Sequence, residues 1–295
     1  MPAPSRPREP RLDLTGRVLG DRFRLEARLF DTETASMYRA HDLRGGGAIA
    51  VKVLHPELDA AREERFHREG RILAKLRHPH IAEFIDCNKT PHGYYYIATA
   101  FIDGEPLDEW CGSEKRLRPE EVWRIGVQVA EALMQAHAVG VIHRDVKASN
   151  ILWTGQGAKL VDFGLAKVMP AATLELKPPR HPTAVGIPLG TEGYMPPEAG
   201  DTIDARTDVF ALGRTLYRLL ARRPAIDWPE GLEDAPVPLR RVVLEAGDPD
   251  TEQRPATMAE LRERLMIAGA HLWPQRSPGP ALRPALHVWP VPADK

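Results

Sequence analysis

Apolar and polar residues in the first third of the chain form short runs with the length and apolar character of β-strands. Three such runs, RFRLEARL (22–29), ASMYRAHD (35–42) and AIAVKVL (48–54), surround a GGG turn at 45–47, and IAEFIDCN (81–88) and GYYYIATAFI (93–102) follow later. Between them, AREERFHREGRILAKLRHP (61–79) changes to helical spacing. This part is predicted to be a small antiparallel sheet interrupted by one helix.

The pattern becomes mostly helical from about residue 106. PEEVWRIGVQVAEALMQAHAVG (119–140) has Pro119 at a first-turn position and Gly140 as a stop. DVFALGRTLYRLLA (208–221) and TMAELRERLMIA (257–268) are two further amphipathic runs, and no internal repeat is present. We expect an α+β fold of two lobes around a cleft, a β-rich lobe at about 17–101 and a larger helical lobe at about 102–268.

Proline is concentrated at both ends, in MPAPSRPREP and in WPQRSPGPALRPALHVWPVPADK. Proline removes a backbone donor and restricts the residue before it, so we expect no regular structure in these two stretches. They belong to an N-terminal extension at 1–16 and a C-terminal tail at 269–295. The tail is interpreted as a disordered or surface-hugging extension. A polyproline segment that binds a partner is the alternative.

Composition narrows the function classes. The chain has 295 residues, 43% of them hydrophobic, and 40 basic and 41 acidic residues give a net charge of -1. That balance argues against nucleic acid or an anionic membrane as the main partner. Cys87 and Cys111 form neither a disulfide framework nor a metal cluster, and no run has the length of a signal or membrane segment. A cytoplasmic protein without a membrane span is expected, and the oligomeric state stays open.

The candidate catalytic residues are concentrated in two stretches, VIHRDVKASNILW (141–153) and AKLVDFGLAK (158–167). Phosphoryl transfer needs acidic and amide oxygens for magnesium, a cation for phosphate and a carboxylate near the attacking hydroxyl, and each of these types is present here in the expected order. Taken singly, Asp145 could cap a loop and Asn150 could occupy a turn. Their joint spacing disfavours those alternatives.

With these motifs the chain resembles the eukaryotic-type (Hanks-type) protein kinase superfamily, and within it the bacterial serine/threonine protein kinases, over about residues 20–268. The resemblance implies ATP and Mg²⁺ as cofactors and a protein with a Ser or Thr acceptor as substrate. It makes Asp145 the catalytic base, places Lys147 on the transferred phosphoryl group, and gives Asn150 and Asp162 to magnesium.

The resemblance also assigns residues around the nucleotide. Lys52 is expected to hold the α and β phosphates, paired with Glu69 on the following helix; the alternative is that both are ordinary solvated charges. Thr99 resembles the residue at the back of the adenine pocket. Further nucleotide contacts are expected from Leu29, Met37, Ala50 and Leu152, and a stack from Leu73, His143 and Phe163.

Residues 162–198 resemble an activation segment that ends in GTEGYMPPE. By resemblance, Asp208 anchors the catalytic loop and Glu198 pairs with Arg254, a pair that small-molecule kinases of related fold generally lack. The KASN sequence with Thr191 resembles Ser/Thr rather than Tyr specificity. Thr183, and second Thr173, is predicted to be an activating phosphorylation site that meets two cations, Arg144 and Lys167.

Two departures from the family pattern stand out. The glycine-rich phosphate loop is replaced by FDTETASM (30–37), with Phe30, Thr32 and Ala35 in the glycine places and Met37 in the valine place. A non-glycine residue forced to positive φ costs about 1–2 kcal/mol, so we expect weakened ATP affinity without loss of the chemistry. In addition, AIDWPEGLEDAPVP (225–238) leaves room for at most a single turn where the family has a helix that docks substrates.

Two other functions remain open. A pseudokinase that senses nucleotide or acts as a scaffold is favoured by the glycine-free loop and the shortened helical lobe. A small-molecule kinase is disfavoured by Glu198, Asp208 and Arg254.

Overall fold

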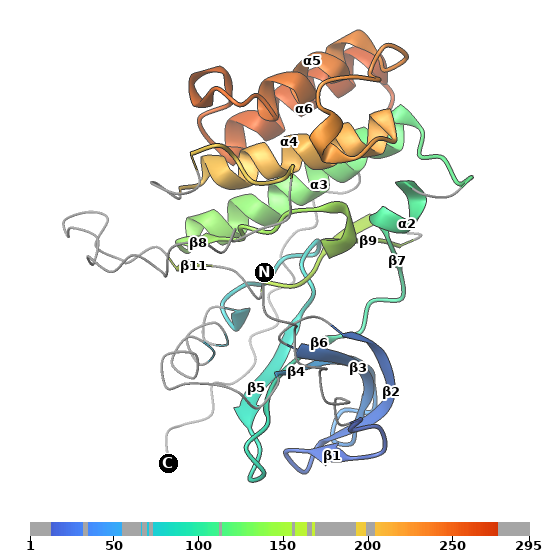
Figure 1. Ribbon diagram of the computed structural model, residues 1–295, viewed down its shortest axis with the longest axis vertical. Helices are drawn as coiled ribbons and strands as arrows, with labels where there is room; N and C mark the ends of the chain where they lie inside the picture. The colour runs from blue at the N-terminus through green and yellow to red at the C-terminus, as the bar shows by residue number, and fades with distance from the viewer. Residues whose placement is uncertain are drawn as a thin grey trace, which may run out of the picture. The chain divides into compact units, whose positions relative to one another are not determined.

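The computed structural model describes residues 13–31, 35–54, 66, 70, 73–111, 114–154, 157–163, 167–168, 193–198 and 204–276. The chain divides into two units, Met1–Ala74 with Phe84–Ile102 and Lys75–Glu83 with Asp103–Lys295. Figure 1 labels helices and strands of both units. The first is built on a sheet and the second mainly on helices, which confirms the predicted α+β class.

The first unit is an antiparallel sheet in the order β1-β2-β3-β4-β6-β5. Its strands agree with the predicted runs to within a few residues, and the turn at 45–47 joins two of them. Only the two-residue β1 was not predicted. The strands are β1 Val18–Leu19, β2 Phe23–Asp31, β3 Ala35–Asp42, β4 Ala48–Leu54, β5 Phe84–Lys89 and β6 Tyr95–Ala100.

One face of this sheet is closed by a hydrophobic core. Side chains alternate along β4, so Ile49, Val51 and Val53 are buried while the residues between them are half-buried. Tyr38 of β3 and Tyr96 of β6 join them with almost no exposed surface. The opposite face is therefore the one on which β4 can present side chains to a ligand.

The second unit packs four helices side by side, as Figure 1 shows for α3 to α6. They are α3 Pro119–Ala138, α4 Arg206–Ala221, α5 Val237–Ala246 and α6 Met258–Leu272. α3 begins at Pro119, and Gly140 with φ 76° follows its end, as predicted. No helix in the described part of the chain is both long and apolar enough to cross a bilayer.

α6 ends at Leu272, four residues beyond residue 268, where the helical lobe is expected to end. The reason is packing against α3. The Trp123 ring occupies the place where a side chain at Gly269 would lie, and its Nε1 donates to the Leu265 carbonyl at 2.8 Å. Trp273 then stacks on Trp123 with ring centroids 5.5 Å apart. Residues 1–12 and 277–295 lie outside the described residues.

Short elements connect the helices of the second unit. β9 and β10 form a hairpin to which β7 adds, and β8 pairs with β11. The shortened region after α4 contains only the 3-10 turn η2 before α5, as expected. The elements are β7 Glu105–Pro106, α2 Leu107–Cys111, β8 Val141–Ile142, η1 Ala148–Asn150, β9 Ile151–Thr154, β10 Gly157–Leu160, β11 Lys167–Val168, η2 Ala225–Asp227 and η3 Thr251–Gln253.

Candidate active site

Four of the predicted nucleotide contacts of the first unit share one face of its sheet. Met37 lies opposite Lys52, and Ala50 lies opposite Thr99, in the registers of β3 with β4 and β4 with β6. Directly paired residues point to the same side of a sheet. Because Ala50 and Lys52 alternate with core residues, all four project from the face opposite the core. A small residue, a cation and a hydroxyl are thus gathered on one surface.

Leu29, Glu69 and Leu73 are the other residues of this unit that were predicted to lie around the nucleotide or in the stack. Leu29 lies in β2, at an irregularity of the ladder between Arg28 and Phe30, and its side chain is exposed. Glu69 lies outside the described residues, so its pairing with Lys52 stays a prediction. Leu73, expected in the stack, is buried.

The glycine-free segment is built as an ordinary hairpin over its described residues. The ladder continues to the pairs Phe30 with Met37 and Asp31 with Ser36. Non-glycine residues with positive φ in the described chain are Asp21, Arg144, Asp162 and Arg222, and none of them belongs to this hairpin. The strain that a non-glycine residue suffers at positive φ is therefore not incurred at Phe30 or Ala35. Thr32 lies outside the described residues.

A polar clip of Arg28, Asp31 and Ser36 fixes this hairpin. Arg28 forms a two-pronged ion pair with Asp31, in which Nε donates to Oδ1 at 2.9 Å. The buried Ser36 hydroxyl donates to the same Oδ1 at 2.7 Å. The negative charge of Asp31 is thus offset by a cation of its own hairpin.

In the second unit, the loop after β8 brings together the predicted catalytic residues Asp145 and Lys147 and the predicted magnesium ligand Asn150. Lys147 Nζ lies 2.9 Å from Asp145 Oδ2, and Asn150 Nδ2 donates to that same oxygen at 3.0 Å and to the Asp145 carbonyl at 2.8 Å. Asp145 and Lys147 are partly exposed, whereas Asn150 is buried. A carboxylate is therefore held between an ammonium and an amide and keeps access to solvent.

Asp162 is tied to this loop through the main chain. The N–H of Val161, its neighbour, donates to the Asn150 carbonyl at 2.9 Å. Asp162 itself has φ 58°, a left-handed conformation that turns the chain sharply after β10. Leu152, a predicted nucleotide contact, lies half-buried in β9, where it pairs with Pro106 of β7 and Lys159 of β10.

Asp208 anchors the catalytic loop from α4, as predicted. Its Oδ1 accepts the Arg144 N–H at 2.8 Å, its Oδ2 accepts the His143 N–H at 2.9 Å, and His137 Nε2 lies 2.7 Å from Oδ2. The carboxylate has no exposed surface. Burial raises its pKa, but the hydrogen bonds from His137 and Arg144 outweigh this and hold the pKa below its ordinary value. Asp208 is thus a buried anion.

His143 supports the loop as a neutral ring. Burial lowers its pKa, and its two nitrogens have complementary partners. Nε2 lies 3.3 Å from the Val161 carbonyl, and Nδ1 accepts the Asp145 N–H at 3.3 Å. The ring also packs on Phe163, with centroids 4.5 Å apart. Two members of the predicted stack are therefore in contact within this unit.

Arg144 carries a guanidinium with unused donors. Its Nε and Nη2 are covered from solvent and have no hydrogen-bond partner among the described residues. Burial lowers the pKa of Arg144 to about 10, so the group stays cationic at neutral pH. The backbone of Lys167 pairs with Ile142, two residues before Arg144. Thr173, Thr183 and Thr191 lie outside the described residues.

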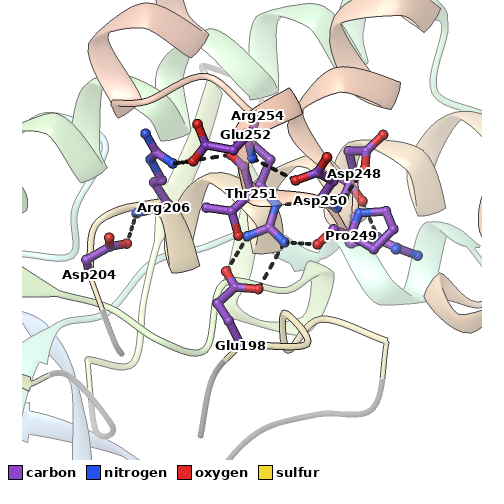
Figure 2. A network of polar contacts seen from close by, with 11 residues as sticks. Glu198, Asp204, Arg206, Asp248, Pro249, Asp250, Thr251, Glu252 and Arg254 are labelled. Atoms are coloured by element: carbon purple, nitrogen blue, oxygen red, sulfur yellow. Dashed lines mark hydrogen bonds and ion pairs between the residues drawn. The ribbon is translucent and has the colours of Figure 1, made fainter. Parts of the chain in front are cut away.

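The predicted pair of Glu198 and Arg254 is confirmed. Figure 2 shows the Arg254 guanidinium pointing at the Glu198 carboxylate, with Nη1 2.5 Å from Oε1 and Nη2 3.1 Å from Oε2. Arg254 also donates to the carbonyls of Asp248 and Pro249 at 2.5 and 2.8 Å. Its side chain is fully buried. Burial raises the pKa of Glu198, but the hydrogen bond and charge of Arg254, together with further hydrogen bonds to the carboxylate, outweigh this and lower the pKa.

Two arginines of α4 make long-range contacts that were not predicted from the sequence. Buried Arg214 donates from Nε to the Gly247 carbonyl at 2.9 Å, and Arg218 donates from Nη2 to Asp108 Oδ1 at 2.7 Å. Both partners are distant in sequence, so no local pattern indicates them. Their four-residue spacing on one helix was the only available signal.

Comparison with known proteins adds family information to this geometry. The profile of the protein kinase domain matches residues 29–261. A probable serine/threonine-protein kinase of Streptomyces coelicolor is 34% identical over 220 residues, which cover 70% of this chain and 31% of the relative. For Pkn1 of Myxococcus xanthus the identity is 34% over 274 residues (83% and 38%), and for PknB of Mycolicibacterium smegmatis it is 32% over 278 residues (85% and 44%). The chain spans less than half the length of each relative.

Proposed function

This chain belongs to the protein kinase domain family, and from that premise we propose that it is a serine/threonine kinase that transfers the γ-phosphoryl group of ATP to Ser and Thr of proteins. The observation that carries the proposal is the arrangement of Asp145 with Lys147 and Asn150 on a loop anchored by Asp208. The named relatives are serine/threonine-protein kinases, which supports the same acceptor class.

Each residue of the loop has a chemical task in this proposal. Asp145 accepts the proton of the attacking hydroxyl, and the bond from Asn150 holds its carboxylate in one orientation. Lys147, 2.9 Å from that carboxylate, is placed to meet the transferred phosphoryl group next to the acceptor.

The donor set of the loop fits magnesium. Asn150 uses its amide nitrogen toward Asp145, which leaves the amide oxygen to act as a ligand, and Asp162 supplies a carboxylate. Amide and carboxylate oxygens are the ligands that Mg²⁺ prefers. Bound there, the metal would supply charge neutralisation to the phosphates. On the sheet face of the first unit, Lys52 would hold the phosphates, and Ala50, Met37 and Thr99 would border the base.

A protein acceptor is favoured over a metabolite. The Glu198–Arg254 pair fixes the end of the activation segment to the helical unit, and small-molecule kinases of related fold generally lack this pair. The test is to offer a generic basic protein, Ser, Thr and Tyr peptides, and a set of hydroxylated metabolites together with labelled ATP. Label on Ser or Thr supports the proposal, while label on metabolites alone contradicts it.

Autophosphorylation at Thr183 is the second part of the proposal. What supports it is Arg144, whose covered Nε and Nη2 have no partner among the described residues and could meet a phosphate. Mass spectrometry of active protein should find phosphate on Thr183, or second on Thr173, and Arg144→Gln should remove the activation it brings. Full activity in protein with neither threonine phosphorylated would contradict this part.

A nucleotide-binding pseudokinase is the alternative, and the glycine-free hairpin is the observation that favours it. The described part of that hairpin avoids positive φ, so the backbone is not strained by the lost glycines. Binding of ATP without transfer to any acceptor, under conditions in which a related kinase is active, would decide for the pseudokinase.

A further inference from the structure

A cavity of about 380 Å³ opens beside the catalytic loop within the second unit. Three stretches of the chain contribute to it besides α2 and α4: the loop around Lys147, the segment at 193–198, and the turn η2. None of the roles proposed above uses this space. Its lining residues are Asp108, Lys147, Ala148, Ser149, Tyr194, Arg218, Pro224, Ala225 and Ile226.

The position of the cavity links it to the acceptor. Lys147 is both a lining residue and the partner of Asp145 at 2.9 Å. An extended peptide advances about 3.3 Å per residue, so a side chain in this cavity would belong to a residue only a few positions from the acceptor Ser or Thr. The cavity is therefore placed to read the sequence around the phosphorylation site.

Gly193 allows the segment at 193–198, which forms one wall of the cavity, to pack closely against η2. Gly193 has φ 84°, and a side chain there would come within 2.8 Å of the Ile226 nitrogen, so only glycine lets the segment lie against η2. This contact places Tyr194 in the lining. Burial raises the pKa of Tyr194, so its hydroxyl stays protonated and is available as a donor.

Arg218 dominates the charge of the cavity. It projects from α4 and gives Nη2 to a single oxygen of Asp108, at 2.7 Å. Its buried Nε has no hydrogen-bond partner among the described residues. A guanidinium has five N–H donors, so this one retains donors for a second anion. Burial lowers the pKa of Arg218, but its neighbours, Tyr194 and Asp108 among them, outweigh this and raise it, so the guanidinium is cationic.

We propose that this cavity is a substrate subsite for an anionic side chain, a carboxylate or a phosphate, close to the acceptor, and that Arg218 is its specificity-determining residue. The inference rests on the proposed function, because it concerns the peptide that the kinase phosphorylates. The Arg218 guanidinium binds the anion through the donors that Asp108 leaves unused. The Tyr194 hydroxyl adds a neutral donor.

A basic side chain fits this cavity less well, although Asp108 is present. Arg218 is 23% exposed and Asp108 is 48% exposed, so water and salt screen the carboxylate more than the guanidinium. Asp108 also has one oxygen committed to Arg218. For an incoming lysine, the repulsion by Arg218 would therefore be screened less by solvent than the attraction by Asp108.

The experiment uses the full chain with a positional peptide set around one Ser or Thr acceptor. At each flanking position, kcat/KM is measured for Glu, Gln, phosphoserine, Ser and Lys. At one position or more, Glu should exceed Gln by about tenfold, the factor that one charge-assisted hydrogen bond of 1.4 kcal/mol gives. Comparison of Glu with phosphoserine then distinguishes a carboxylate site from a site for a previously phosphorylated substrate.

Variants of the two paired residues should shift this ratio in opposite directions. Arg218→Gln should bring the Glu-to-Gln ratio near one, and Asp108→Asn should raise it, because it removes the anion that competes for Arg218. Arg241→Gln, which removes an exposed arginine of α5, is the matched control and should leave the ratio unchanged. The ratio is taken within each variant, so a general loss of activity does not alter it.

The outcomes separate the subsite from the kinase function. Phosphorylation of the peptides with Glu and Gln within twofold at every position, or with Lys preferred, would overturn the subsite and leave the kinase proposal standing. The same holds if Arg218→Gln keeps the Glu preference. Transfer to no peptide at all would overturn the proposed function and the subsite with it.

Discussion

Asp208→Asn tests how the catalytic loop is held, because it changes charge and hydrogen bonding while the side chain keeps its size. The carboxylate accepts two backbone N–H groups, from His143 at 2.9 Å and Arg144 at 2.8 Å, and lies 2.7 Å from His137 Nε2. An amide has one acceptor oxygen, so whichever way it turns, its NH₂ faces at least one backbone N–H. Asp208 has no exposed surface, so water cannot replace the lost partner.

The magnitude follows from these contacts. A hydrogen bond to a charged group contributes about 1.5–3 kcal/mol, and leaving a buried donor unpaired costs about 1–3 kcal/mol more. We expect Asp208→Asn to lower the free energy of unfolding of the helical unit by about 3–5 kcal/mol. Because Asp145 follows Arg144 directly, a shift of the loop by about 1 Å should lower kcat by about a hundredfold.

The assay is urea unfolding followed by tryptophan fluorescence, together with kcat and KM for ATP and a peptide. Asp204→Asn is the matched control, because the Asp204 carboxylate is exposed and, among the described residues, accepts a single hydrogen bond, from the Arg206 N–H at 2.8 Å. The control should change stability by less than about 1 kcal/mol and leave kcat unchanged. The reasoning is refuted if Asp208→Asn is as stable and as active as that control.

Three further predictions concern other parts of the molecule. Arg254→Lys should destabilise the helical unit by about 2–4 kcal/mol in urea unfolding, since one ammonium cannot replace a guanidinium that bonds two carboxylate oxygens and two carbonyls; a change below about 1 kcal/mol would contradict this. Ser36→Ala should raise the KM for ATP by up to about fivefold with little change in kcat, because it removes a hydrogen bond that stabilises the hairpin conformation by about 1 kcal/mol. An unchanged KM would show that the clip does not position the loop. The hydrogen bond from Arg22 lowers the pKa of buried Asp42 to about 2, so its contribution is present at neutral pH and lost as pH falls from about 5 to 2. Asp42→Asn should therefore lose about 2 kcal/mol of stability at pH 7 and be less acid-sensitive than wild type, and parallel pH profiles of unfolding would rule this out.

The sequence predicted the elements whose signals are local. β4 was predicted at its observed bounds, because apolar residues alternate through AIAVKVL. α3 was predicted from Pro119 at its start and Gly140 beyond its end. The loop anchor at Asp208 and the pair of Glu198 with Arg254 came from the family resemblance, and the structure contains both.

What the sequence could not provide are contacts between distant residues and the effect of packing on boundaries. α5 was not predicted, because it is only ten residues long and follows a proline-rich stretch. The extension of α6 to Leu272 depends on Trp123, more than 130 residues earlier. The pair of Arg218 with Asp108 likewise joins residues 110 positions apart. The described residues of the glycine-free hairpin have ordinary backbone dihedrals, which the sequence could not indicate because it was equally compatible with a strained loop.

The most direct test of the central claim is a single-turnover measurement of phosphate transfer. Purified chain is mixed with labelled ATP and Mg²⁺, and label on the protein and on an added Ser or Thr peptide is followed beside Asp145→Asn, with nucleotide affinity measured for both. The account predicts transfer by the wild type, loss of transfer in Asp145→Asn, and similar nucleotide affinity in the two proteins. Nucleotide binding by the wild type without any transfer would contradict it and assign the chain to the pseudokinases.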